Sequence, residues 1–142
     1  MRVLFVFGPN LGALGSREPE RYGSATLPEV MEDVAKRGAE LGHKVEWRQS
    51  DHEGELVGWV RDAGGEGFEA VVLNGGALTH YSYSLRDAIE AGTAPVVEVH
   101  QTNIYAREEF RRHSVISPVV RISIAGAGTH GYHLALDALS TL

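Results

Sequence analysis

Two residues with complementary acid–base chemistry stand two positions apart in the second half of the chain. Glu98 lies within the mainly apolar stretch 95–99, and His100 directly follows it. Because alternate side chains of a strand point to the same face, the carboxylate and the imidazole share a face, roughly 6–7 Å apart along the chain. Such a carboxylate can fix the tautomer of the imidazole and make it a general acid near neutral pH. The spacing equally fits a hydrogen-bonded structural pair at a sheet edge.

Polar side chains also follow two other apolar stretches. Asn10 comes soon after the run 3–7, and Asn74 and His80 follow the run 70–73. Asn74 opens an Asn-Gly-Gly sequence that could turn tightly and leave room for a ligand beside the backbone. It fits a plain strand-to-helix turn as well, and His80 by itself fits a structural or surface histidine.

Two arginines, Arg107 and Arg111, stand four residues apart further along the chain. The segment 104–110 is expected to form a short helix, so the two side chains would share one helical face. An arginine pair near a strand end could bind a substrate carboxylate. The alternative is a solvated face on which the arginines pair with Glu108 and Glu109.

These residues can act together only if the fold brings them close, and the order of predicted strands and helices along the chain indicates such a fold. Apolar runs and their punctuation predict strands and helices in turn. The alternation predicts one α/β domain over residues 1–142, a flavodoxin-like five-stranded parallel sheet with helices on both faces. In such sheets ligands bind beyond the carboxyl ends of the strands, so the candidate residues should meet at one edge. The expected strands are 3–7, 44–49, 70–73, 95–99 and 121–125, and the expected helices are 26–41, 53–63, 83–91, 104–110 and 132–139.

The segment 8–25 is expected to be a long loop, because it holds six glycines and prolines and shows no clear period. It carries Arg17 and Tyr22. Loops of that length inside compact domains are usually functional or disordered. The next residues, Thr26 to Glu29, have the form of a capping box, so a helix should begin there and close at Gly42.

The composition narrows the classes of function. The chain has 142 residues, 43% hydrophobic and 23% charged, which is typical of a globular domain. A net charge of −6 argues against a nucleic-acid-binding face, and no apolar run is long enough to span a bilayer. The chain has no cysteine, which removes thiolate chemistry. The first residues lack the features of a signal peptide, so a cytoplasmic location is expected.

Three familiar mechanisms find little support in the sequence. The first glycine-rich loop lacks the Lys-Ser/Thr ending of a P-loop. The segment 126–131 fits GxGxxG, but it lies too near the end of the chain for a dinucleotide-binding unit and is expected to be a turn into the last helix. The only lysines are Lys36, inside an expected helix, and Lys44, at the start of a strand. Both lie away from the expected site, which argues against Schiff-base catalysis.

Five segments taken together resemble the type II 3-dehydroquinate dehydratases, and they span nearly the whole chain. The resemblance implies a flavodoxin-like fold and conversion of 3-dehydroquinate to 3-dehydroshikimate by anti elimination through an enolate. It also implies that no metal, cofactor or Schiff base takes part, and that the chain assembles as a dodecamer built from trimers. The segments are GPNLGALGSREPERYG (8–23), SDHEGELVGWV (50–60), LNGGALTHYSYSLRDAI (73–89), VEVHQTNIYAREEFRRHSVIS (97–117) and GAGTHGYHLAL (126–136).

The same resemblance implies catalytic roles by position. Tyr22 would be the base that removes the C2 proton, and Arg17 would hold it as a phenolate. A tyrosine ordinarily has a pKa of about 10, so a tyrosinate at neutral pH costs about 4 kcal/mol. An adjacent arginine in a closed pocket can supply much of that. His100 would protonate the departing hydroxyl, Glu98 would orient His100, and Asn10 would hold a water that stabilises the enolate.

The remaining candidates would bind the substrate. The resemblance assigns its hydroxyls and carboxylate to Asn74, His80, Arg111 and the backbone at Gln101 and Thr102. Arg107 would help to shape the pocket, and Asp87 would reach toward a site in a neighbouring subunit.

The chain departs from the family pattern at a few positions. Phe7 stands where asparagine is usual before Gly-Pro-Asn, and Thr102 replaces a serine. Tyr81 and Tyr83 stand where smaller residues are common. These changes are expected to affect subunit packing, assembly, specificity or the rim of the pocket rather than the reaction.

Two other functions compete with the dehydratase. One is a non-catalytic binding or assembly module that keeps the appearance of the site. The other is a metal hydrolase that uses His80, Glu98 and His100, which are adequate zinc ligands although no HxH or HExxH spacing supports the site. Tyr22 and Arg17 discriminate, because a binding module has no need for a tyrosinate and a metal hydrolase has no need for Arg17.

Overall fold

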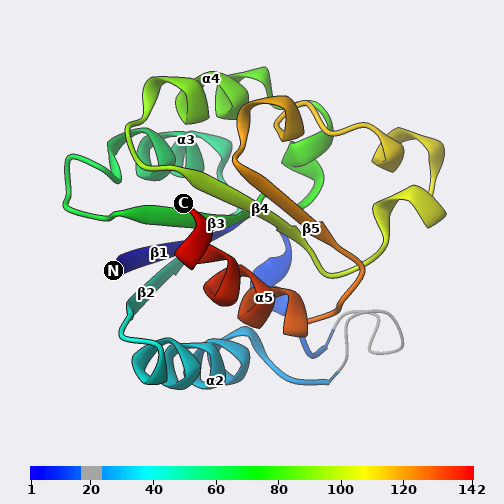
Figure 1. Ribbon diagram of the computed structural model, residues 1–142. Helices are drawn as coiled ribbons and strands as arrows, with labels where there is room; N and C mark the ends of the chain where they lie inside the picture. The colour runs from blue at the N-terminus through cyan, green and yellow to red at the C-terminus, as the bar shows by residue number, and fades with distance from the viewer. Residues whose placement is uncertain (17–23) are drawn as a thin grey trace.

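A parallel sheet forms the centre of the molecule (Figure 1). The computed structural model describes residues 1–16 and 24–142. Every strand pairing is parallel, and the strand order is β2-β1-β3-β4-β5. The predicted five-stranded α/β architecture is therefore confirmed. The strands are β1 (Arg2–Phe7), β2 (Lys44–Gln49), β3 (Ala70–Asn74), β4 (Val96–His100) and β5 (Ile122–Ala125).

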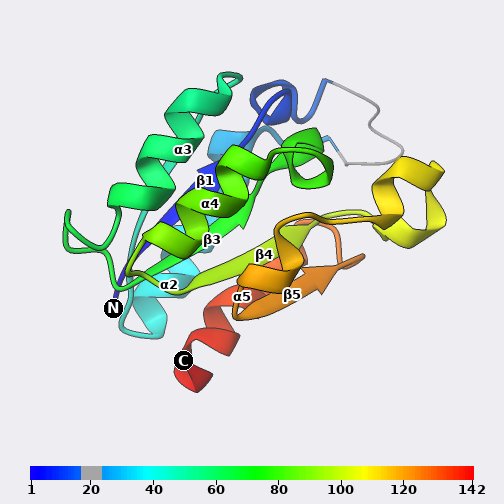
Figure 2. The ribbon, with the colours of Figure 1, turned by 90° about the horizontal axis from the view of Figure 1, so that it is seen from above.

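Helices cover both faces of this sheet (Figures 1 and 2). Two of them, α2 (Leu27–Glu40) and α5 (His130–Ala138), pack on one face and share a core with it. Helices α3 (Glu53–Asp62) and α4 (Tyr83–Ala91) pack on the opposite face. The predicted two-sided covering is confirmed, with ends that differ by one or two residues.

The strand β1 shows why the central strands are apolar without interruption. Val3, Phe5 and Phe7 belong to the core under α2 and α5, whereas Leu4 and Val6 belong to the core under α3 and α4. Because both faces of an all-parallel sheet are covered, alternate side chains of a central strand must all be apolar. Phe7 is buried in this core, with its ring 5.4 Å from that of Tyr132.

The start and the end of α2 follow the predicted signals. The hydroxyl oxygen of Thr26 accepts the backbone N–H of Glu29 at 3.4 Å, and the Glu29 carboxylate accepts the Thr26 hydroxyl at 2.9 Å. The helix ends before Gly42, whose φ of 82° is a left-handed conformation that glycine adopts without a steric cost.

The prediction of a helix over residues 104–110 is wrong. The chain instead forms two separate 3₁₀ turns, η3 (Ile104–Ala106) and η4 (Glu109–Arg112). Arg107 lies between them with φ −110° and ψ −157°, an extended backbone that a helix cannot pass through. Arg107 and Arg111 therefore do not share a helical face.

The glycine-rich segment near the end of the chain is a turn, as predicted. Gly126 and Gly128 have φ values of 95° and 61°, and they lead from β5 into α5. Among residues 1–16 and 24–142, no helix is both long and apolar enough to cross a membrane.

Candidate active site

A pocket opens beyond the carboxyl ends of β1, β3 and β4, the edge at which the candidate residues were expected to meet. It brings together side chains from the first loop, from the turn after β3 and from the segment after β4. Its lining consists of Pro9, Asn10, Leu11, Leu14, Asn74, Gly76, Ala77, His80, His100, Gln101, Thr102, Ile104, Arg107 and Arg111.

The predicted pairing of Glu98 with His100 forms at the end of β4. Nε2 of His100 lies 2.6 Å from Oε2 of Glu98. His100 lines the pocket, whereas Glu98 is fully buried behind it. A carboxylate can only accept at this contact, so Nε2 carries the proton and Nδ1 is the ring nitrogen left for a ligand.

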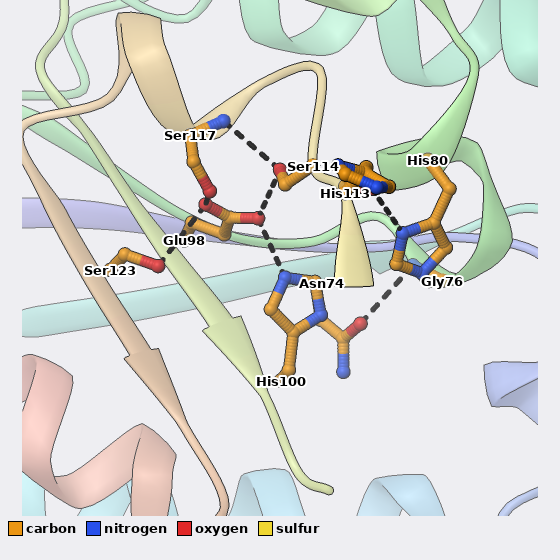
Figure 3. Close-up of polar contacts among 9 residues, drawn as sticks. All are labelled: Asn74, Gly76, His80, Glu98, His100, His113, Ser114, Ser117 and Ser123. Carbon is orange, nitrogen blue, oxygen red and sulfur yellow. Dashed lines mark hydrogen bonds and ion pairs between the residues drawn. The ribbon is translucent and has the colours of Figure 1, made fainter. Parts of the chain in front are cut away.

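Four donors converge on the Glu98 carboxylate (Figure 3). Oε2 also accepts the hydroxyl of Ser114 at 2.8 Å, and Oε1 accepts the hydroxyls of Ser117 and, at 3.2 Å, Ser123. Burial by itself would raise the pKa of Glu98, but the hydrogen bonds from His100, Ser117 and Ser114 hold that pKa below its ordinary value. Glu98 is therefore ionised at neutral pH.

His80 is the second imidazole of the pocket. Its Nδ1 lies 2.7 Å from the backbone oxygen of His113, so Nδ1 carries the proton and Nε2 is an acceptor in the neutral ring (Figure 3). Burial is the main reason why the pKa of His80 lies below its ordinary value. The rings of His80 and His100 are stacked, with centroids 6.3 Å apart. Nε2 of His80 and Nδ1 of His100 are thus the ring nitrogens available to a ligand, and Nδ1 of His100 can donate only when its ring carries a second proton.

A buried hydroxyl joins two amides of the pocket wall. Nδ2 of Asn74 donates to the Tyr132 hydroxyl at 2.9 Å, and this hydroxyl donates to Oε1 of Gln101 at 2.9 Å. Oδ1 of Asn74 accepts the backbone N–H of Gly76 at 3.1 Å. Burial strongly raises the pKa of Tyr132, which stays a neutral phenol. Among the described residues, Nε2 of Gln101 is buried with no hydrogen-bond partner.

Asn10 enters the pocket in an unusual backbone conformation. Its φ of 70° is left-handed, and it is the only non-glycine residue with a positive φ in the described part of the chain. Its backbone N–H donates to the Asp51 carboxylate at 2.9 Å, which holds the first loop against the end of β2. Asparagine tolerates this conformation better than most residues do.

Both arginines reach the pocket by the bend between the two 3₁₀ turns. Nη1 of Arg107 donates to the Thr102 hydroxyl at 3.3 Å. Nε of Arg111 pairs with the Glu108 carboxylate, as the solvated-face alternative proposed, while Arg111 also lines the pocket. The two guanidinium groups give this wall a positive charge suited to an anionic ligand.

Some predicted site residues either lie away from this pocket or fall outside the described part of the chain. Asp87 lies exposed on α4, so its expected role toward a neighbouring subunit stays a prediction. Arg17 and Tyr22 lie outside the described residues. Within the described ranges, no three His, Cys, Asp or Glu side chains are grouped as a metal site requires.

Sequence reasoning missed four residues that support the site. Tyr132 contacts partners 58 and 31 positions away, and no local pattern signals such a contact. Ser114, Ser117 and Ser123 stand 16, 19 and 25 positions from Glu98. The Ser-x-x-Ser spacing of the first two was a weak signal of a hydrogen-bonded turn.

Known proteins match this chain over almost its whole length. A family model described as Dehydroquinase class II matches residues 1–140. The 3-dehydroquinate dehydratase of a Thermus thermophilus strain is 58% identical over 138 residues, which are 97% of this chain and 93% of that one. The 3-dehydroquinate dehydratase of Pelotomaculum thermopropionicum is 51% identical over 142 residues, 100% of this chain and 98% of that one.

Solved structures agree with the family match. The crystal structure of a type II dehydroquinase from Propionibacterium acnes superimposes with a TM-score of 0.94 at 45% identity, covering 99% of this chain and 97% of that one. The type II dehydroquinase from Butyrivibrio crossotus gives a TM-score of 0.95 at 38% identity, with the same coverage. This chain therefore belongs to the class II dehydroquinase family.

Proposed function

We infer that this chain is a type II 3-dehydroquinate dehydratase of the shikimate pathway, which removes water from 3-dehydroquinate to form 3-dehydroshikimate. The family match and the names of its relatives support the activity. The observation in the site that best supports this activity is the buried Glu98–His100 pair, because His100 lines the same pocket as Arg107 and Arg111. A hydro-lyase needs such an acid, because hydroxide is a poor leaving group until it is protonated.

The acid half of the proposed reaction uses His100. Protonated His100 gives its Nδ1 proton to the departing hydroxyl, the carbon–oxygen bond breaks, and water leaves. Glu98 remains ionised throughout and stabilises the positively charged ring through Nε2. Its burial strengthens this attraction, since no water screens the pair.

The base half is assigned by resemblance to Tyr22 and Arg17. The Tyr22 phenolate takes the C2 proton, the electron pair of that bond forms the enolate, and the enolate expels the hydroxyl. Asn10, at the mouth of the pocket, holds the water that stabilises the enolate oxygen. One proton must then pass from Tyr22 to His100, directly or through solvent, before the next turnover.

The described pocket supports a division of labour in substrate binding. Nδ2 of Asn74 has a second hydrogen beyond the one that it gives to Tyr132, and this hydrogen can donate to a substrate hydroxyl. Nε2 of neutral His80 can accept from another hydroxyl. The carboxylate would lie against Arg111 and the backbone of Gln101 and Thr102, with Arg107 shaping that wall.

The assembly and the location belong to the same proposal. We expect a single catalytic domain in the cytoplasm that assembles as a dodecamer built from trimers, in which Asp87 reaches the site of a neighbour. The exposed rings of Tyr81 and Tyr83, 61% and 68% exposed at the start of α4, support a contact near Asp87. Light scattering of the purified protein measures the mass of the assembly directly.

The activity is tested by the absorbance of the conjugated enone when purified protein meets 3-dehydroquinate. Turnover should survive a chelator and borohydride, and it should be lost in Arg17→Ala. Tyr22→Phe should bind 3-dehydroquinate without turning it over. A wild-type protein that gives no enone would overturn the assignment in favour of a binding module, and turnover that stops with the chelator would favour a metal hydrolase.

A further inference from the structure

Three serines contact the Glu98 carboxylate on the sides that His100 leaves open (Figure 3). We call Ser114, Ser117 and Ser123 the serine cage. None of the three lines the pocket, so none is placed to touch a ligand there. Together with His100 they supply two donors to each carboxylate oxygen.

The direction of the cage hydroxyls is set by the backbone. The Ser114 oxygen accepts the N–H of Ser117 at 3.0 Å, which occupies a lone pair and leaves the hydroxyl proton to point at Glu98. Ser123 is the residue of β5 that pairs in register with Glu98 of β4. The main chain thus orients the hydroxyl of Ser114 and positions Ser123 beside Glu98, and neither arrangement depends on a bound ligand.

The turn that carries Ser114 and Ser117 is anchored to the body of the protein. Ile116 lies between them with its side chain fully buried. The N–H of Val115 donates to the backbone oxygen of Thr79 at 2.9 Å, which ties the turn to the segment η2 (Gly76–His80). Ser114 and Ser117 are therefore held by the same part of the backbone that positions His80.

The protonation state of Glu98 depends on these donors. A fully buried carboxyl group without donors becomes neutral, because water no longer solvates its charge. A neutral Glu98 would carry its own proton and would no longer be a pure acceptor for His100. The positively charged form of the ring would then lose its stabilising carboxylate, and the neutral ring that remains is too weak an acid to protonate a departing hydroxide.

We propose that the serine cage is a set of positioning residues, which keep Glu98 ionised and aimed at His100 so that Nδ1 of His100 delivers the proton. The proposal rests on the proposed function in one respect, that His100 is the acid. Among the described residues, His80 on η2 interacts electrostatically with both members of this pair and Arg111 on η4 with His80, and both are unchanged in the variants below.

The test compares Ser114→Ala and Ser117→Ala with a matched control, Ser82→Ala. Ser82 is buried, whereas Ser114 and Ser117 are partly buried, and like Ser114 it donates to a carboxylate, that of Glu53, and accepts a backbone N–H three residues on, that of Leu85. The control therefore loses the same kind of contact as Ser114→Ala, but away from Glu98.

Two readouts separate a positioning role from a structural one. In the cage variants we expect the acid limb of the kcat profile to move to higher pH, with kcat at neutral pH lower by about three- to tenfold and KM nearly unchanged. The ¹³C signal of the Glu98 carboxyl carbon, assigned by its loss in Glu98→Gln, should titrate at higher pH than in the wild type. Neither quantity should move in Ser82→Ala.

Two further variants keep the proposal falsifiable if an alanine variant does not fold. Ser117→Thr keeps a hydroxyl and should restore the wild-type profile, while Ser123→Ala, which removes the longest contact, should give the smallest shift. A Glu98 titration that stays at the wild-type pH in folded cage variants, or that moves equally in Ser82→Ala, would overturn the proposal. Because this titration needs no turnover, it reports on the cage even if the proposed substrate is wrong.

Discussion

The hydroxyl of Tyr132 offers the sharpest test of how the pocket wall is held. Tyr132→Phe removes one oxygen and leaves the ring packed against Phe5 and Phe7. Two contacts are lost, one from Nδ2 of Asn74 and one to Oε1 of Gln101, each 2.9 Å long. Because all three side chains are buried, water does not readily replace the missing hydroxyl.

The expected loss of stability follows from these two orphaned groups. A buried donor or acceptor without a partner costs about 1–3 kcal/mol. Leaving both Nδ2 of Asn74 and Oε1 of Gln101 without this partner should lower the free energy of unfolding by about 2–4 kcal/mol, after some local relaxation. The Asn74 amide would keep its contact with the Gly76 N–H but lose the one that fixes Nδ2, so we expect kcat/KM for 3-dehydroquinate to fall by about tenfold.

Urea unfolding and steady-state kinetics measure the two effects. The matched control is Tyr105→Phe, since Tyr105 is 60% exposed and its loss of a hydroxyl should change stability by less than about 0.5 kcal/mol. If Tyr132→Phe unfolds at the same urea concentration as this control, the hydroxyl does not bridge the two amides, and the bridge is not what holds this wall of the pocket.

Three further predictions concern the acid pair, a close backbone contact and a helix start. The lowered pKa of Glu98 implies stability that is complete above its ordinary value of 4.5 and is lost as the pH falls through the lower folded value, so the urea midpoint should fall more steeply with acid in the wild type than in Glu98→Gln. Gly8→Ala would place a Cβ 2.4 Å from the backbone oxygen of Gly75, so it should lower the free energy of unfolding by about 1–3 kcal/mol and weaken substrate binding. In the control Gly54→Ala the new Cβ meets nothing within 4 Å, so stability should not fall. Equal melting temperatures of the two variants would contradict this prediction. Thr26→Ala should lower the free energy of unfolding by about 1 kcal/mol with kcat intact, and an unchanged urea midpoint would show that the cap contributes nothing.

The strands and the main helices could be predicted because their signals are local. The run 3–7, which has the length of a strand and ends at Gly8-Pro9, is typical of a strand buried on both faces, and the strand β1 is buried in that way. The Thr26 cap and Gly42 mark the two ends of α2 by their own backbone requirements. The Glu98–His100 contact was predictable for the same reason, since strand periodicity places both side chains on one face.

The segment 104–110 shows where local signals fail. Its residues are compatible with a helix, but the structure has an extended Arg107 between two turns. That bend brings both Arg107 and Arg111 to the pocket, where Arg107 contacts Thr102. Helix propensity is a difference of less than about 1 kcal/mol per residue, which a few tertiary contacts outweigh.

The sequence by itself determined the sheet, the edge at which the pocket forms and the contact between Glu98 and His100, because each depends on spacing along one element or on strand alternation. Only the tertiary structure decided what holds that pair and the pocket wall. Ser123 meets Glu98 through the register of β4 and β5, and Tyr132 reaches Asn74 across the core from α5. Contacts between residues so far apart in the chain exist only once the elements have packed, so no local pattern records them.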